Sequence, residues 1–106
     1  MNETIAILCT CPDKATAERL ARGLVEQRHA ACVNILPAVR SIYAWKGEVQ
    51  DQQEVMMVIK TTHAHFFVIE HWLEEHHPYE VPELLALDAE HVSEAYLRWL
   101  RATVST

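Results

Sequence analysis

The stretch that decides the fold is residues 4–25, TIAILCTCPDKATAERLARGLV. Its first seven residues, Thr4–Thr10, are rich in β-formers and are followed by Pro12 and Asp13, which indicates a strand. Asp13 is a suitable N-cap for a helix. Apolar side chains then recur at helical spacing and form one stripe: Ala17, Leu20, Ala21, Leu24 and Val25. The stretch therefore predicts a strand followed by an amphipathic helix.

The rest of the chain continues this alternation of strands and helices. Further strands are predicted over Ala31–Leu36, resumed at Arg40–Trp45, then over Glu54–Thr61 and Val81–Leu87. Helices are predicted over about His63–Glu75 and from Ser93 to Leu100. The two segments on either side of Pro37 could form one long, bent strand, and Lys46-Gly47-Glu48 marks a turn after it. Pro82 suggests that the last strand lies at a sheet edge.

The element order is therefore βαββαβ with a terminal helix, in one domain over residues 1–106. This order is that of the ferredoxin-like α+β sandwich, in which the first and third strands lie in the middle of the sheet. We expect those two strands to be the most buried part of the fold.

The two predicted central strands are apolar on both faces. Ile5, Ile7 and Cys9 point to one side of the first strand, whereas Ala6 and Leu8 point to the other. Right-handed crossovers would place both main helices on a single side of the sheet. The opposite face would then expose an apolar patch of a size that monomers rarely tolerate. The terminal helix could cover part of this face and another subunit could cover all of it, so we expect an oligomer.

Composition excludes several classes of protein. The formal net charge is −6 and the 9 Lys and Arg residues are not clustered, which argues against a nucleic-acid binder. With 2 glycines, the chain lacks a Gly-rich phosphate loop. No run of about 18 apolar residues predicts a membrane span. Three cysteines and an N-terminus without a basic segment predict a protein of a reducing, cytoplasmic compartment.

Cysteine and histidine are the residue types that could carry chemistry. Cys9 lies late in the first strand, and His76 and His77 lie where Pro78 ends the second helix. Thiolate and imidazole ligands suit copper or zinc better than magnesium or calcium. The neighbouring acids Glu74 and Glu75 would favour a bound cation, although the spacing matches no zinc signature such as CxxC or HExxH.

Other interpretations of these residues remain open. Cys9 and Cys32 could be small core hydrophobes, since free cysteine is among the most buried residue types. The histidines earlier in the second helix, His63, His65 and His71, fit solvated positions. A Cys–His nucleophile pair would need an oxyanion site, and no Gly-rich turn of exposed amides follows Cys9. The segment around Pro78 could instead be a stiff turn at a subunit contact.

Several longer motifs stand out along the chain: AACVNI at residues 30–35, SIYAWKG at 41–47, KTT at 60–62, HPYEVPEL at 77–84 and YLRWL at 96–100. Together these motifs resemble those of one known family, the CutA divalent-cation tolerance proteins. The resemblance spans nearly all of the chain. It implies a ferredoxin-like fold related to the trimeric PII signalling proteins, assembled as a homotrimer with the sheets packed inward.

The resemblance also implies a function and a site. It implies a non-enzymatic protein that contributes to the response to divalent metal ions and binds one copper ion per subunit, with other divalent metals possible. By motif, the ligands would be Cys9, His76 and His77. No nucleic acid or membrane partner is implied, and an additional protein partner could exist. The alternative function is a PII-like signalling module that binds a small ligand or a partner protein in clefts between subunits.

Two segments depart from the family pattern. Cys11 stands where relatives usually carry a small residue, and on a strand it would face the same way as Cys9. It could add a second thiolate or permit artefactual oxidation. Residues 89–94, AEHVSE, differ from the usual connection, which leaves any site function of that segment in doubt.

Overall fold

The computed structural model describes residues 3–105. The secondary structure elements, in chain order, are β1 (Thr4–Cys11), α1 (Lys14–Glu26), β2 (Cys32–Trp45), β3 (Glu48–Thr62), a 3₁₀ turn η1 (His63–His65), α2 (Phe66–His76), β4 (Leu85–Asp88) and α3 (Glu94–Thr103). The predicted βαββαβ order with a terminal helix is confirmed.

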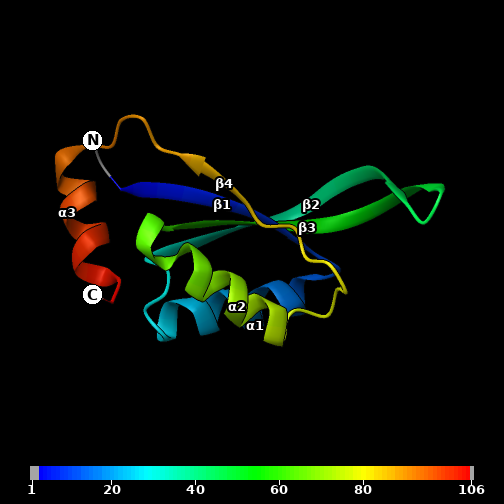
Figure 1. The fold of residues 1–106 in the computed structure, drawn as a ribbon, viewed down its shortest axis with the longest axis horizontal. Helices are drawn as coiled ribbons and strands as arrows, with labels where there is room; N and C mark the ends of the chain where they lie inside the picture. Colours follow the sequence, from blue (N-terminus) through cyan, green and yellow to red (C-terminus); the bar gives the residue numbers. More distant parts are fainter. Residues whose placement is uncertain (1–2, 106) are drawn as a thin grey trace.

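The four strands form one antiparallel sheet in the order β2-β3-β1-β4. The predicted central position of β1 and β3 is confirmed, and the two strands pair along their whole common length, from Thr4 opposite Thr62 to Cys11 opposite Val55. Helices α1 and α2 both lie against the same face of this sheet (Figure 1). The architecture is therefore an open two-layer α+β sandwich.

The main core lies between this face and the two helices. Alternate residues of the central strands point into it, as the two-residue period of a strand requires. Its fully buried large side chains are Ile5, Ile7, Leu20, Leu24, Met57, Ile59, Ile69 and Leu73. The predicted inward stripe of α1 is confirmed except at its C-terminal end, where Val25 is exposed. Helix α1 begins where predicted, because the Asp13 carboxylate accepts a hydrogen bond of 2.7 Å from the Thr16 N–H.

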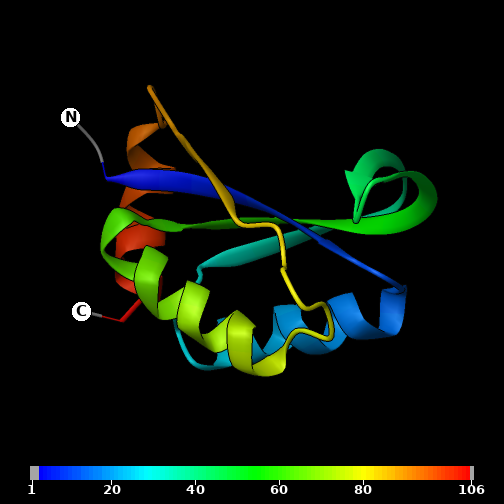
Figure 2. The same ribbon diagram turned by 45° about the vertical axis from the view of Figure 1, so that its right-hand side comes forward.

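Strands β2 and β3 form a long hairpin that extends past the rest of the sheet and curls (Figure 2). Its turn places Lys46 at φ 50° and Gly47 at φ 80°, and two successive positive φ angles are the geometry of a tight two-residue hairpin turn. The register shifts between Leu36 and Val39, around Pro37, so the bent continuous strand is confirmed. β3 begins at Glu48, six residues before the expected start, because the polar run to Gln53 pairs with β2.

Other predicted element bounds also differ from the structure: α2 begins at Phe66 rather than at His63, which opens the 3₁₀ turn η1. Residues 81–84 are not strand, so β4 contains only the last part of the expected Val81–Leu87 segment. Pro82 has no N–H to offer a strand partner, and pairing with β1 starts at Leu85. The predicted position of this strand at a sheet edge is confirmed. The terminal helix α3 continues to Thr103, and Ser93 precedes it without a side-chain capping bond.

Helix α3 lies at the end of the sheet opposite the hairpin (Figure 1). Leu100 and Val104 form a small second core with Ala31, and Tyr96 packs against it. The Lys60 ammonium lies 5.9 Å from the centroid of the Tyr96 ring. α3 therefore covers only one end of the sheet.

The sheet face away from α1 and α2 keeps apolar side chains exposed, as predicted. Leu36, Leu85 and Leu87 are 42%, 54% and 49% exposed. Their pairing partners on the central strands, Met56, Leu8 and Ala6, share this face.

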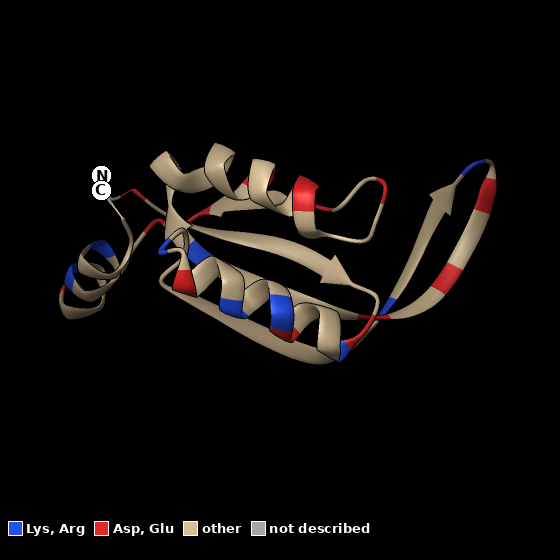
Figure 3. Cartoon of the chain, turned by 90° about the horizontal axis from the view of Figure 1, so that it is seen from below, with Lys and Arg blue, Asp and Glu red and all other residues tan. Residues whose placement is uncertain are grey.

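Figure 3 shows acidic residues along the hairpin and basic residues along α1. Among the described residues, no helix is long and apolar enough to cross a membrane.

Candidate functional site at the carboxyl end of β1

Two thiols lie together at the carboxyl end of β1. Cys9 and Cys11 are separated by one residue, so their side chains point to the same face of the strand. Both side chains have no exposed surface, and the two thiols lie within hydrogen-bonding reach of each other. Within residues 3–105 the three cysteines are free of disulfides.

The two thiols differ in acidity because they share a hydrogen bond. The bond from Cys9, together with the nearby His77 ring, lowers the pKa of Cys11 to about 6, although burial opposes this shift. The same hydrogen bond, followed by burial and by nearby negative charges, raises the pKa of Cys9 well above its ordinary value. When the pair loses one proton, the negative charge therefore resides on Cys11.

His77 is buried and both of its ring nitrogens have hydrogen-bond partners. Nε2 lies 2.8 Å from the carbonyl oxygen of Thr10, to which it donates. Nδ1 lies 3.1 Å from the Tyr79 backbone nitrogen and accepts its N–H. The imidazole is therefore the neutral Nε2–H tautomer in this arrangement, and it joins the end of α2 to the end of β1.

His76 points elsewhere. Its ring stacks on Trp72 with the centroids 4.0 Å apart, and Nδ1 lies 2.7 Å from the Trp72 carbonyl oxygen. The guanidinium of Arg19, on α1, donates a hydrogen bond of 3.2 Å to the backbone carbonyl oxygen of His76. His76 is exposed, and its Nε2 has no hydrogen-bond partner in the described part of the chain.

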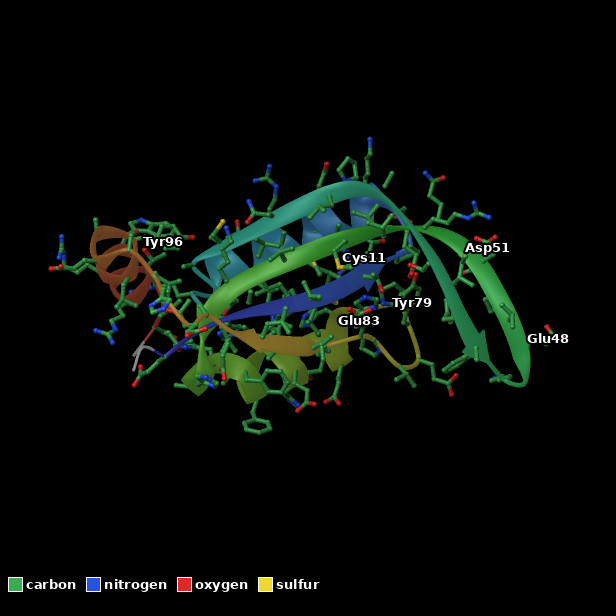
Figure 4. The ribbon with its side chains drawn as sticks, turned by 90° about the horizontal axis from the view of Figure 1, so that it is seen from above. Cys11, Glu48, Asp51, Tyr79, Glu83 and Tyr96 are labelled. Atoms are coloured by element: carbon green, nitrogen blue, oxygen red, sulfur yellow. The ribbon has the colours of Figure 1, made fainter. Side chains whose placement is uncertain are left out.

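A cleft of about 750 Å³ lies next to the thiols, between the hairpin and the segment after α2. Its lining combines apolar and aromatic side chains with carboxylates: Thr10, Arg40, Ser41, Ile42, Tyr43, Trp45, Glu54, Pro78, Tyr79, Glu80, Val81 and Glu83. Figure 4 shows Cys11, Tyr79 and Glu83 close together at the middle of the molecule, with Glu48 and Asp51 out on the hairpin and Tyr96 at the opposite end.

A buried carboxylate forms the inner wall of this cleft. Glu54 is 6% exposed and accepts a hydrogen bond from the Tyr79 hydroxyl, with the two oxygens 2.5 Å apart. Burial and this carboxylate raise the pKa of Tyr79 above its ordinary range. Partial burial, followed by repulsion from Glu54, raises the pKa of Glu83. The only basic residue in the lining, Arg40, is already paired with Asp51 on the neighbouring strand.

The structure brings together part of the predicted ligand set. Cys9 and His77 both lie at the carboxyl end of β1, but the His76 ring is turned onto Trp72. Among residues 3–105, no three His, Cys, Asp or Glu side chains converge in a way that could hold a metal ion. In this arrangement, the donors of Cys9, His76 and His77 do not form a three-ligand site.

Several residues of the site lay beyond what the sequence indicated. Tyr79, Glu54 and Glu83 meet only through the tertiary fold, although HPYEVPEL carried two of them. The expectation that His65 is solvated is wrong: its ring is buried, with Nδ1 2.7 Å from the Thr62 hydroxyl and Nε2 3.1 Å from that of Ser105. The expectation that Cys32 is a core residue is also wrong, since it is half-buried. Cys9 is a core residue, as one interpretation held.

Comparisons with known proteins agree with this fold. Residues 5–103 match the family model described as CutA1 divalent ion tolerance protein. The chain is 42% identical over 102 residues to the divalent-cation tolerance protein CutA of Citrobacter koseri, covering 96% of this chain and 89% of that protein.

Solved structures give the same result. The divalent cation tolerance protein CutA1 from Thermus thermophilus superposes with a TM-score of 0.93 at 41% identity, covering 96% of this chain and 99% of that one. CutA1 from the psychrotrophic bacterium Shewanella sp. SIB1 superposes with a TM-score of 0.94 at 39% identity, covering 99% and 98%. The match in fold, length and sequence means that this chain belongs to the CutA1 family of divalent-cation tolerance proteins.

Proposed function

We propose that this chain acts in divalent-cation tolerance by binding copper, or another soft divalent ion, without catalysing a reaction. The proposal rests above all on the meeting of buried thiols and an imidazole at the carboxyl end of β1. Thiolates and imidazoles prefer soft and borderline metals. The carboxylates of Glu54 and Glu83 in the adjoining cleft add an electrostatic preference for cations.

The proposed ligands are Cys9, His76 and His77, with one ion per subunit. The free Nε2 of His76, in the part of the chain that the structure describes, is the donor most readily available to an ion. His77 would have to give up one of its two hydrogen bonds, and His76 would have to leave its stack on Trp72. Binding at these three residues therefore requires both rings to move.

A copper titration tests this ligand set. We expect the Cys9→Ala variant and the double variant His76→Ala/His77→Ala to lose affinity for Cu(II), while His71→Ala, a matched change on exposed α2 surface, leaves it unchanged. Because thiols must lose a proton and imidazoles must be neutral to bind, affinity should fall on acidification. Equal affinity in all of these variants and the unaltered protein would refute these ligands.

We also propose that the protein is a cytoplasmic homotrimer. The exposed apolar face of the sheet, with Leu36, Leu85 and Leu87, supports burial against other copies. Three free cysteines support a reducing compartment. Light scattering should give a mass near three times the 12.2 kDa of one chain, and a mass near one chain would refute the trimer.

The cleft favours a second candidate function, a signalling module of the PII kind that binds a small ligand or a partner protein. A cleft of about 750 Å³ with aromatic and charged lining is within the size range of ligand sites. A thermal-shift screen separates the two functions. Stabilisation by a nucleotide or a small anion but not by copper supports the module, and the reverse pattern supports metal binding.

A further inference from the structure

The pair of thiols on β1 carries an inference beyond the three-ligand copper site. Cys9 and Cys11 are side by side on one face of a central strand, and neither forms a disulfide within the described residues. We infer that Cys9 and Cys11 together form a two-thiolate site for a monovalent soft cation, Cu(I) or Ag(I). This inference shares with the proposed function only the binding of a soft metal ion, and its ligand set is a different one.

Strand geometry favours an ion over a disulfide between these residues. Residues i and i+2 of a strand are about 6.6–6.8 Å apart. This Cα separation lies at the upper limit of the range of about 4.4–6.8 Å that disulfides span, so the extended backbone of β1 is poorly suited to one. Two metal–sulfur bonds of about 2.3 Å, the length typical of zinc, would hold the sulfurs about 4.6 Å apart. The two side chains point to the same face of β1 and are both buried, so rotation about their Cα–Cβ bonds brings the sulfurs toward one ion.

The number of available ligands also selects the ion. No third His, Cys, Asp or Glu side chain in the described residues completes a metal site with these thiols. Divalent zinc usually takes four ligands. Cu(I) and Ag(I), by contrast, accept two thiolates in a nearly linear arrangement. Thiolates favour Cu(I), zinc and iron–sulfur clusters among the biological metals, and of these Cu(I) needs the fewest ligands. Each thiol releases its proton to solvent as the ion binds, and no electron is transferred.

The surroundings hold the two thiols in place. Cys9 lies opposite Met57 and Cys11 opposite Val55 in the pairing of β1 with β3. The residue between them, Thr10, accepts a hydrogen bond on its carbonyl oxygen from His77 Nε2 at 2.8 Å. His77 is therefore a positioning residue for this pair, because it fixes the peptide that separates the two cysteines.

An acidic cleft adjoins the thiols, although neither cysteine lines it. Thr10, the residue between the cysteines, lines it, and so do Tyr79 and Glu83, which lie beside Cys11 in Figure 4. The carboxylates of Glu54, Glu80 and Glu83 attract a cation into this space. The hydrogen bond from Tyr79 to Glu54 lies on the inner wall of this cleft and orders the acidic side chains beside the thiols.

Anaerobic titration with Cu(I), and separately with Ag(I), against a competing chelator tests the inference. We expect Cys9→Ser and Cys11→Ser each to weaken binding by more than the roughly 10–100-fold that follows loss of an outer-shell partner. The matched control is Cys32→Ser, because this third thiol is half-buried on β2 next to Asn34 and belongs to neither site. It should leave affinity unchanged.

A second measurement on the unaltered protein covers the case in which a serine variant does not fold. X-ray absorption of the Cu(I)-loaded protein should show two sulfur neighbours and no nitrogen neighbour. One sulfur with one or two nitrogens, or a Cys11→Ser variant that keeps full Cu(I) affinity, would overturn the inference. Such a result would still support the Cys9, His76 and His77 set.

The opposite result is equally distinct. If Cu(I) binds through two sulfurs while Cu(II) affinity is indifferent to His76→Ala/His77→Ala, the two-thiolate site is supported and the three-ligand site fails.

Discussion

Gly23 of α1 lies directly against the indole ring of Trp72 of α2. A Cβ atom placed on Gly23 would lie 2.5 Å from Trp72 Cζ2 and 2.6 Å from Cη2, closer than any real contact. The glycine that weakens α1 locally therefore allows the two helices to pack together on the sheet. The same indole ring stacks with His76, which connects this helix packing to the candidate site.

We expect Gly23→Ala to destabilise the protein although alanine is the better helix former. The substitution gains about 0.5–1 kcal/mol of helix propensity, but overpacking against a rigid ring costs typically about 1–3 kcal/mol. Urea unfolding should show a lower midpoint. The double variant Gly23→Ala/Trp72→Leu should lose less than the sum of its single changes, because removing the ring relieves the clash. Additive losses would contradict this packing.

The Tyr79–Glu54 hydrogen bond makes a second prediction. Tyr79→Phe leaves a carboxylate that is 6% exposed without its hydroxyl partner, and we expect a loss of about 1–3 kcal/mol in the free energy of unfolding. Tyr43→Phe is the matched control, since Tyr43 makes an exposed hydrogen bond to Gln52. Denaturant unfolding of both variants measures the two losses in free energy of unfolding. Equal losses would mean that the buried Tyr79–Glu54 bond stabilises the fold no more than the exposed Tyr43–Gln52 bond does.

Sequence patterns among neighbouring residues were sufficient to predict most of the fold. The Asp13 cap, the stripe of α1 and the alternation of β1 between two apolar faces are all properties of neighbouring residues. Each was found where expected, apart from the exposed Val25 at the end of the stripe. The length of the β2–β3 hairpin was underestimated because polar residues such as Asp51 and Gln53 pair with β2 although they are not buried. The start of β4 was placed too early because Val81 is typical of strands. Pro82, however, has no N–H to donate to a neighbouring strand, so pairing with β1 begins only at Leu85.

The candidate site was only partly predictable for a different reason. Cys9 and Cys11 are close in sequence, so their shared face followed from strand geometry. Glu54 and Tyr79 are 25 residues apart, and their bond exists only because α2 returns the chain to the end of β1. The direction of the His76 ring depends on a stacking partner one helical turn earlier, and nothing in a motif distinguishes that ring from a ligand.

Glu83 makes the stability depend on pH. Partial burial, and then the charge of Glu54, raises the Glu83 pKa above its ordinary value of 4.5, so the folded protein binds this proton more tightly than the unfolded chain. Stability from this group is therefore fully present below pH 4.5 and is lost as the pH rises through the folded pKa. Glu83→Gln should raise stability at neutral pH by on the order of 0.5 kcal/mol.

The check is urea unfolding at neutral pH and below pH 4.5. The gain from Glu83→Gln should disappear at the lower pH, where the carboxyl group is already protonated. Glu80→Gln, a change of the same chemistry in the same cleft, should give no comparable pH-dependent gain. A gain from Glu83→Gln that persists unchanged at low pH would show that ionisation of Glu83 is not its cause.

Arg28 attaches helix α3 to the rest of the protein. Its guanidinium donates to the carbonyl oxygens of Thr103 at 3.1 Å, Ala102 at 3.3 Å and Val104 at 3.4 Å, and its own carbonyl accepts the Ser105 N–H at 2.9 Å. These are the unpaired carbonyls of a helix C-terminus, where a positive charge is also favourable. Since α3 has only a small core of its own, we expect these bonds to determine how often it opens.

Arg28→Asn tests this expectation without changing the backbone preference. Arg28 has φ 60°, a conformation that asparagine tolerates better than most residues, so the change chiefly removes the guanidinium. Hydrogen exchange should become faster by several-fold in the last turn of α3 and stay unchanged in β1 and β3. Arg98→Asn, which removes an exposed pair with Glu94 on α3 itself, is the control and should have a much smaller effect. If both variants exchange equally, the C-terminal helix is held by Leu100 and Val104 alone, and the guanidinium contacts do not anchor it.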